Sequence, residues 1–497
     1  MSGGRPKLLW VLLVVIFVGI VAIQNITGPQ YEKIRKAGMS SVDSKDTQEL
    51  MVQLPGQFLI ASMAGFKEVI AGVLWVRADD FFHTGKYEAI IPIVRLVTWL
   101  DPHNVEVYST GAWHLDYNFV DGNQMSDKRY IPSSVALLQE GIANNPNTWD
   151  LYFDLAWSHY NKKLNDYQGG LKYMLLAVQH DGRDPNTGKV IPRPAFVDRM
   201  VAHQYEKVGE FDKAIEQWKY ARARAERLIK DRSDKTADYV ALVTCDRNLA
   251  LLYLRLAWRY GNMDYYRKGV EILQRMAAQK GTPPDILAAA KAASADYAKR
   301  MAAHNPPRDV RKPIDMGFSV KFEKLKPKVF RISGTFNLVR MSEYAGLASE
   351  CVTRRYEEYL KAPPDRKQDW VDGGRVRWML TDLDYKMVIP KTFTWKIDKS
   401  KMVVFERECN AIPVRSGKFK SEPIDLSGND SFYPFKARKY RLVVWASPQE
   451  PGADQTLQDR VGWKGEAYAD GKYLDTKMQP GYRCFRWETV LDRNDLL

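Results

Sequence analysis

The sequence has few of the residues and none of the short motifs that most enzymes use for chemistry. Only 4 cysteines and 7 histidines occur in 497 residues, and no CxxC pair is present. These numbers exclude a disulfide scaffold and a cysteine-rich zinc site. The H-E-x-x-H, G-x-S-x-G, G-x-G-x-x-G and Walker A motifs are also absent. We therefore expect no catalytic residue, no bound metal and no cofactor.

The four cysteines are Cys245, Cys351, Cys409 and Cys484. Buried or unpaired thiols explain all four without any special chemistry. Cys409 and Cys484 both fall in the C-terminal region, where a disulfide between them would need an oxidising compartment. The sequence leaves these two alternatives open.

Acidic side chains are fewer than basic ones, 60 against 74, which gives a formal net charge of +14. A basic protein can bind anionic partners such as a membrane surface, a nucleic acid or an acidic glycan. The excess is spread along the chain, and "KFEKLKPK" (321–328) is the one dense basic run. Because nucleic-acid binding usually shows a clustered basic stripe, we do not expect a nucleic-acid partner.

Charged residues are missing from one stretch near the N-terminus. The segment "LLWVLLVVIFVGIVAIQNIT" (8–27) carries none, and about twenty apolar residues span a bilayer. Arg5 and Lys7 precede it and no A-x-A cleavage site follows, which indicates an uncleaved transmembrane anchor. Positive charge before the segment favours a cytoplasmic N-terminus. We expect a single-pass membrane protein with residues 1–7 in the cytoplasm and an extracytoplasmic body, periplasmic or on the cell surface.

The rest of the chain divides into a helical part and a strand-rich part. Residues 28–45 are a polar linker, and residues 46–304 have helical patterns interrupted by Gly, Asn-Pro and Asp-Pro. Residues 305–327 form a second linker. Residues 328–497 alternate with period two in short runs, which predicts an all-β sandwich of immunoglobulin or fibronectin-III type. The expected strands are 328–339, 375–380, 391–398, 402–406, 440–447 and 482–490, with one helix at 342–361.

Two shorter segments carry their own expectations. "FLIASMAGFKEVIAGVLW" (58–75) is apolar but interrupted by Lys67 and Glu68. Neither half is long enough to span a bilayer, so we expect a buried or interfacial helix there. The segment 462–475 contains a glycine-bearing turn and is expected to form a hairpin whose aromatic side chains face the core.

One helical pattern recurs within residues 46–304. The stretch "GEFDKAIEQWKYARARAE" (209–226) has the order glycine, aromatic, small, large aromatic, small. The same offsets recur from Gly85, and parts of the order recur at 134–146 and 266–276. The positions in the first stretch are Gly209, Phe211, Ala214, Trp218 and Ala221, and the small residues on the preceding helices are Ala78, Ala112, Ala156, Ala202 and Ala257.

This order of small and aromatic residues resembles that of the tetratricopeptide repeat (TPR). The resemblance covers roughly residues 71–280 and implies a multidomain protein whose all-α solenoid binds a protein or peptide in its concave groove. Small residues would let the two helices of a repeat approach, and aromatic residues would fill the space between repeats. A generic helical solenoid is the alternative. The expected repeats are 71–104, 105–147, 148–182, 195–228 and 240–280, followed by a capping helix at 284–303.

A tryptophan follows the small residue of the first helix in three repeats, in "AWHLDY" (112–117), "AWSHY" (156–160) and "AWRY" (257–260). Successive helical residues are 100° apart, so each tryptophan points away from the paired helix, toward the face that lines the groove in the family. Large aromatics are typical binding anchors; stiffening of the inner wall is the alternative. The candidate partner-binding residues are Trp113, Tyr117, Trp157, Tyr160, His203 and Trp258.

The sequence favours one function over two others. The anchor, the repeats and the missing catalytic motifs favour a membrane-anchored, non-catalytic scaffold or adaptor in a membrane or cell-envelope complex. An envelope glycan-binding accessory protein or hydrolase is the second hypothesis, motivated by Asp382 and Asp384 in "LTDLDY" (380–385); solvated turn acids are the simpler interpretation of that pair. An integral subunit of a larger membrane complex is a variant of the first hypothesis.

Overall fold

The computed structural model describes two long stretches and several short ones of the chain. The expected anchor (8–27), the linker that follows it and the expected helix at 342–361 lie outside the described residues and stay predictions. Within the described part, no helix is both long enough and apolar enough to cross a bilayer. The described residues are 65–303, 313–336, 375–393, 404–405, 412–427, 435–448 and 461–497, with gaps at 87–88, 119–129, 165, 184–187, 232–238, 280–283, 314, 385, 416, 436, 463 and 479–480.

The chain forms two compact units. The first comprises Met1–Gly122, Arg129–Leu155 and Met387–Asp398, and the second comprises Asn123–Lys128, Ala156–Lys386 and Lys399–Leu497.

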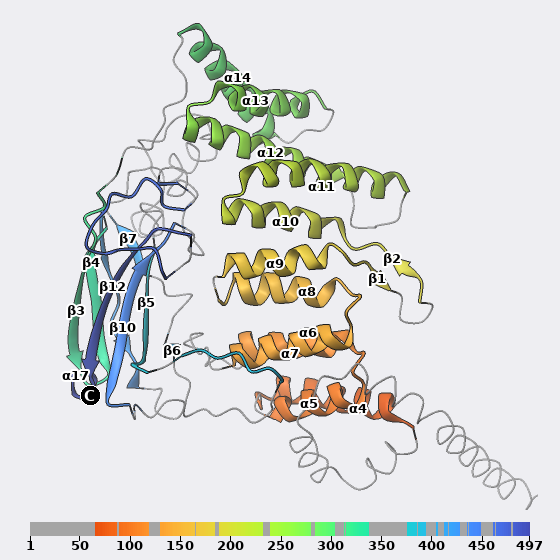
Figure 1. The fold of residues 1–497 in the computed structure, drawn as a ribbon, viewed down its shortest axis with the longest axis vertical. Helices are drawn as coiled ribbons and strands as arrows, with labels where there is room; N and C mark the ends of the chain where they lie inside the picture. The colour runs from red at the N-terminus through yellow and green to blue at the C-terminus, as the bar shows by residue number, and fades with distance from the viewer. Residues whose placement is uncertain are drawn as a thin grey trace, which may run out of the picture. The chain divides into compact units, whose positions relative to one another are not determined.

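The first unit contains paired helices (Figure 1), and glycines lie where two of them pack closely. At Gly111, a Cβ would lie 3.0 Å from a methyl of Val94, and at Gly141 it would overlap the ring of Tyr108. The backbones approach this closely because glycine has no side chain, and the interior stays tightly packed. Its helices are α4 (Lys67–His83), α5 (Ile90–Leu100), α6 (Val105–Trp113), the π-helix η2 (His114–Asn118), α7 (Ile131–Asn144) and α8 (Asp150–Asp154).

The second unit contains further helices of the same kind. Trp218 and Tyr266 are fully buried, and they pack with the small residues Ala202, Ala221 and Ala257 in one core. Large rings and small residues thus fill the space between neighbouring helices as the repeat pattern predicts. The helices are the π-helix η3 (Leu155–Asn161), α9 (Tyr167–Ala177), α10 (Ala195–Val208), α11 (Phe211–Asp231), α12 (Tyr239–Tyr260), α13 (Met263–Ala277) and α14 (Pro284–Ala302); a small hairpin of β1 (Gly182–Arg183) and β2 (Val190–Ile191) lies between α9 and α10.

Each of the five expected repeats contains two helices in the described residues, where η2 continues α6 and η3 continues α8, and α14 follows where a capping helix is expected. Gly209, between α10 and α11, has φ +75°, a left-handed conformation that glycine adopts without strain. The helical region is therefore consistent with TPR-like repeats.

The C-terminal region is an antiparallel sheet, which confirms the expected all-β class. β10 lies near its centre, paired with β12 along Lys439–Ala446 and with β5 along Tyr440–Trp445. The strands are β3 (Ser319–Lys326), β4 (Val329–Thr335), β5 (Arg375–Asp382), β6 (Val404–Phe405), β7 (Ile412–Arg415), β8 (Lys418–Lys420), β9 (Ile424–Asp425), β10 (Lys439–Ala446), β11 (Leu474–Asp475) and β12 (Cys484–Asp492); the helix α17 (Arg493–Leu496) follows β12. The order is β11-β12-β10-β5-β7-β8-β4-β3, with β6 beside β5 and β9 beside β4.

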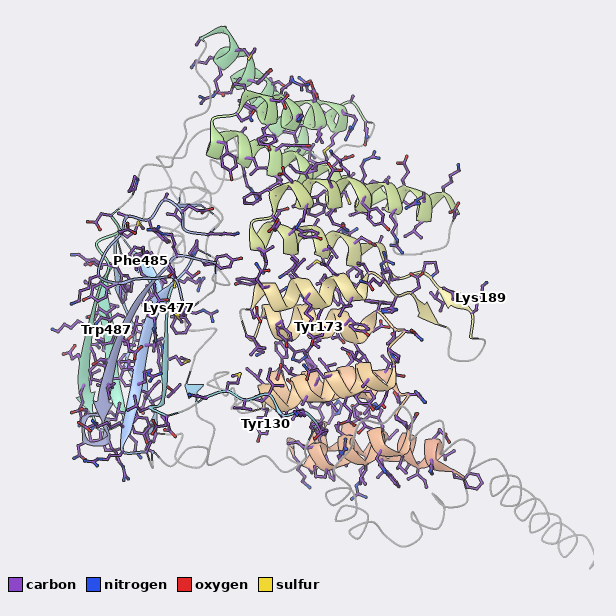
Figure 2. All side chains as sticks on the ribbon, in the orientation of Figure 1. Tyr130, Tyr173, Lys189, Lys477, Phe485 and Trp487 are labelled. Carbon is purple, nitrogen blue, oxygen red and sulfur yellow. The ribbon has the colours of Figure 1, made fainter. Side chains whose placement is uncertain are left out.

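The expected immunoglobulin- or fibronectin-like sandwich is corrected by this hydrogen bonding. A two-residue ladder, Arg375↔Pro413 and Val376↔Ile412, joins β5 to β7. The ten described strands of the C-terminal region, β3 to β12, therefore form one continuous sheet, curled as a half-barrel around its own core, instead of two separate sheets. Period-two alternation identifies the buried face of each strand, but it does not show where one ladder continues into the next. On β12, Phe485 and Trp487 both lie on the core-facing side (Figure 2).

Three local expectations also change. β3 lies within residues 305–327, where a linker is expected, because Val320 and Phe322 alternate with its lysines and pack against the core. Residues 391–393 form a bend instead of a strand. The described part of residues 462–475 consists of turns and irregular segments together with β11, and Tyr468 and Tyr473 do pack on the core.

Candidate functional site

Two π-helical turns coincide with the Ala-Trp pairs of the candidate groove. η2 begins directly after Trp113, and η3 contains Trp157. A π-turn widens the helix, and such turns are frequent at functional sites. Neither turn is predicted from the sequence, because the i→i+5 hydrogen bonding has no distinct residue pattern.

Each π-helical turn contains a buried polar side chain that is hydrogen-bonded to another helix. In the first unit, Ser134 Oγ donates to Asp116 Oδ1 at 2.5 Å, and both residues are almost fully buried. In the second unit, the amides of Asn161 and Gln204 exchange two hydrogen bonds of 2.6 and 2.8 Å, and Gln204 Nε2 also donates to Tyr167 O at 2.6 Å. A buried polar group costs free energy unless it is hydrogen-bonded, so these pairs hold each turn in one arrangement.

In the first unit, the structure brings Trp113 and Tyr117 together. Their rings are nearly parallel, with centroids 6.3 Å apart, and Trp113 is 45% exposed. His114 fills the space behind them, 4.8 Å from the ring of Phe82, and burial lowers its pKa. His114 therefore stays neutral at pH 7, and the exposed Asp79 is a charged side chain that interacts with it.

In the second unit, Trp157 contacts two lysines. Lys162 Nζ lies 5.3 Å and Lys207 Nζ 5.5 Å from the centre of its indole, and Lys207 also lies 4.8 Å from the ring of Tyr167. Burial and the neighbouring Lys162 lower the pKa of Lys207 to about 8. Neither ammonium forms an ion pair with a carboxylate among the described residues. This group, which we call the Trp157 site, is an aromatic surface with two positive charges.

The remaining predicted site residues lie in other surroundings. Tyr160 packs on Tyr173, 5.1 Å between ring centroids, and burial with this neighbour raises its pKa to about 12. His203 packs edge-on against buried Trp218 at 4.7 Å, and burial lowers its pKa to about 4. The side chain of Trp258 lies outside the described part. Trp113 and Tyr117 belong to the first unit, whereas Trp157, Tyr160 and His203 belong to the second.

A segment of the β region contacts the helix end beside the Trp157 site, within the second unit. The Tyr482 hydroxyl donates a hydrogen bond to the carbonyl of Lys207, and its ring lies 5.9 Å from that of Tyr167. Tyr482 packs with Tyr167 and Val208 in a small buried cluster. Nothing in the sequence pattern indicates this contact, since Tyr482 is 275 residues from Lys207.

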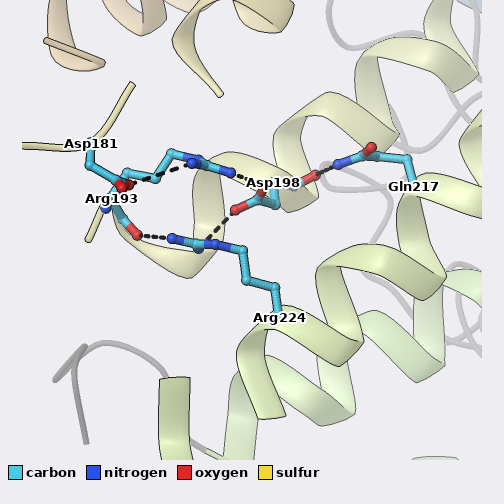
Figure 3. A network of polar contacts seen from close by, with 5 residues as sticks. All are labelled: Asp181, Arg193, Asp198, Gln217 and Arg224. Carbon is cyan, nitrogen blue, oxygen red and sulfur yellow. Dashed lines mark hydrogen bonds and ion pairs between the residues drawn. The ribbon is translucent and has the colours of Figure 1, made fainter. Parts of the chain in front are cut away.

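A network of charged side chains fixes the connection between α9 and α10 (Figure 3). Fully buried Asp198 accepts hydrogen bonds from Arg193 Nη2 and Arg224 Nη1, each at 2.8 Å. Arg224 also donates to the carbonyl of Arg193, and Arg193 reaches Asp181 at 3.5 Å. Because each charge is paired with an opposite charge, the network is structural, although the buried Arg193 Nε has no hydrogen-bond partner.

Asp382 and Asp384, the acids of the second hypothesis, lie at the end of β5. Burial, with a contribution from Asp384, raises the pKa of Asp382 to about 6. In the part of the chain that the structure describes, no group of three or more His, Cys, Asp or Glu side chains is placed to hold a metal. Cys484 is buried and its thiol lies 3.6 Å from Asp475 O; Cys409 is outside the described residues, so a bridge between them stays a prediction.

The chain is similar to solved structures and to no protein-family model. No protein-family model matches the sequence, and no curated protein matches it. Two crystal structures of MamA are similar: one is 16% identical and covers 44% of this chain and 97% of its own, with a TM-score of 0.28. The other is 16% identical and covers 41% and 97%, with a TM-score of 0.26. TM-scores this low do not establish a shared fold, so the TPR-like assignment depends on the helix pairs described above.

Proposed function

We propose that this protein is a membrane-anchored, non-catalytic scaffold that binds a protein or peptide partner on its helical region, as part of a membrane or cell-envelope complex. The observation that carries the proposal is the Trp157 site, where Lys162 and Lys207 both contact one indole. Two ammonium groups beside a partly buried ring would suit a partner segment that carries carboxylates.

The lowered pKa of Lys207 gives such a partner an energetic reason to bind. Its ammonium is disfavoured because it is desolvated and lies near Lys162. A carboxylate placed between the two lysines would favour the charged form and raise this pKa toward its ordinary value. Electrostatic complementarity of this kind gives specificity and fast association.

The Trp113–Tyr117 pair would provide an apolar contact for the same or another partner. Trp113 exposes 45% of its surface, and large aromatic side chains are enriched among the residues that dominate binding energies. The two sites lie in different units, and the proposal requires no single groove that contains both.

Membrane attachment is the second part of the proposal. The uncharged segment 8–27 would span the bilayer, with a cytoplasmic N-terminus and an extracytoplasmic body. A reporter fused after Leu497 tests this orientation: activity of an export-dependent reporter supports it, and activity of a cytoplasm-dependent reporter contradicts it.

Affinity purification of the full chain from detergent-solubilised membranes tests the binding function. We expect a stoichiometric protein partner that is retained by the wild type and lost with Trp157→Ala or with Lys162→Ala. Tyr220→Ala is the matched control, because Tyr220 is 46% exposed on α11 and lies outside both sites. A partner retained by both site variants, or lost equally with the control, would contradict the proposal.

An envelope glycan hydrolase is the second candidate, and one observation favours it. A carboxyl group with a pKa near 6, as in Asp382, suits a general acid at neutral pH. Turnover of a cell-wall glycan by the purified protein, abolished by Asp382→Asn and retained by Trp157→Ala, would support it over the scaffold.

A further inference from the structure

Helix α4 exposes an apolar face. Phe66, Val69, Val73 and Val76 are 40%, 62%, 54% and 73% exposed. Residues three, seven and ten positions after the first fall on the same side of a helix, so the four side chains form one stripe over about three turns. We call this stripe the α4 face.

The opposite side of the same helix is apolar as well, and it is buried. Ile70, Ala71, Leu74 and Ala78 are nearly inaccessible, and α4 packs through them on α5. A surface helix usually has polar residues opposite its buried stripe, so this helix departs from the ordinary pattern. A Cβ at Gly72 would meet no atom within 4 Å, which shows that the space beside the α4 face is open among the described residues.

Contiguous exposed apolar side chains mark a contact with a partner or a membrane. The position of the stripe favours the membrane. The described chain begins at Gly65, directly before Phe66, and residues 28–64 connect it to the uncharged segment 8–27. However that connection is arranged, it cannot exceed about 130 Å. α4 is therefore the first described element to follow the proposed anchor.

One basic side chain beside the α4 face suits a bilayer surface. Arg77 directly follows the last valine and contacts the ring of Phe81. Lys67, in contrast, contacts the ring of Trp99 on α5, which packs on the buried side of α4. Long basic side chains beside an apolar stripe can extend to the lipid headgroups while their stems cover apolar surface. The acidic residues of α4 are Glu68, Asp79 and Asp80, and Asp80, four positions after Val76, ends the apolar stripe.

We infer that the α4 face lies in the interfacial layer of the same membrane that holds the anchor. The inference rests on the proposed anchor, and it adds a second membrane contact that fixes the orientation of the first unit at the bilayer surface. The helix lies along the surface, since its exposed stripe is only about 15 Å long and cannot span the hydrocarbon core.

Photo-crosslinking of the full chain in phosphatidylcholine nanodiscs tests this placement. A benzophenone amino acid replaces Val73 in one variant, Val15 of the anchor in a second, and Glu271, which is exposed on α13, in a third. Mass spectrometry then identifies the crosslinked molecule. We expect lipid adducts at Val73 and Val15, each at a yield at least about tenfold above that at Glu271.

Each outcome separates the inference from the proposed function. Lipid adducts at Val15 without lipid adducts at Val73 overturn the inference and leave the anchor intact. Adducts from Val73 to a peptide of residues 1–64, or to a second copy of the chain, identify a different occupant and also overturn it. Absence of lipid adducts at Val15 overturns the anchor and the inference together.

A charge substitution gives an independent test. In a variant with the crosslinker at Val76, Val73→Glu should reduce the lipid adduct by about tenfold, because a carboxylate disfavours insertion of the apolar stripe. Val240→Glu is the matched control, since Val240 is an exposed valine on α12, 64% accessible, and should leave the yield unchanged. An equal yield with Val73→Glu would overturn the inference.

Discussion

Two Ala-Trp pairs coincide with π-helical turns, one just before η2 and one within η3, and their tryptophans differ in surroundings. Trp113 stacks on Tyr117 and faces solvent, with a neutral histidine behind it. Trp157 contacts two lysines and is partly buried. The comparison teaches that the repeat determines where the indole sits, whereas residues distant in sequence determine its chemistry. Lys207, on a different helix, makes the second site cationic.

The largest effect on stability is expected when the buried amide pair of Asn161, at the end of η3, and Gln204, on α10, is removed. Gln204→Leu leaves Asn161 and the Tyr167 carbonyl without their partner, so we expect the free energy of unfolding to fall by about 3 kcal/mol. Urea denaturation measures it. The double variant Asn161→Leu/Gln204→Leu should recover part of this loss, because neither amide is then left unsatisfied. A single variant as stable as the wild type would contradict the role assigned to the pair.

The charge at the Trp157 site predicts a dependence of stability on pH. The pKa of Lys207 is about 8 in the folded state and near 10.5 in the unfolded state. Between these values the unfolded state binds more protons, so the free energy of unfolding rises as pH increases from 8 to 10.5 and the penalty is fully present below pH 8.

Lys207→Met should remove this dependence. We expect the variant to be more stable than the wild type by about 1–2 kcal/mol at pH 7, and the difference to shrink at pH 10. Thermal unfolding at the two pH values measures it. Lys213→Met is the control, since Lys213 is exposed on α11. An equal difference at both pH values would show that the lysine is not desolvated as the structure indicates.

The smallest expected effect on stability is at the other tryptophan. Trp113→Ala removes a half-exposed ring, so the free energy of unfolding should fall by only about 1 kcal/mol, with no change in pH dependence. The affinity of a partner that binds at the Trp113 site should fall with Trp113→Ala by the same factor at low and high salt. The affinity of a partner that binds at the Trp157 site should decrease as the salt concentration increases. Equal salt dependence of binding at both sites would remove the distinction between them.

The helical part of the fold could be predicted from sequence because the residues that pack against one another lie on helices that are consecutive in the chain. Ala202, Trp218 and Ala221 are close in sequence, and their order reports directly on how two neighbouring helices pack. The curled sheet could not be predicted in the same way. Arg375 of β5 pairs with Pro413 of β7, and residues this far apart in the sequence leave no local pattern that identifies them as partners.

The candidate site was predictable only as far as single helices allow. The Ala-Trp spacing correctly indicates where aromatic side chains recur, but it does not indicate that Lys162 and Lys207 meet at one of them. It also does not show that His203 packs against Trp218 in the core. Contacts of this kind depend on residues from separate helices, and they become visible only when the packing of those helices is known.

The short ladder between β5 and β7 has a mechanical consequence. Among the described residues, two residue pairs join β5 to β7, and one of them includes Pro413, which has no N–H to donate. The ladder on the other side of β7, to β8, also has two described pairs. Local opening around β7 therefore breaks fewer hydrogen bonds than opening of the long β10 ladders, and amide protons of residues 375–376 should exchange with solvent before those at the centre of β10.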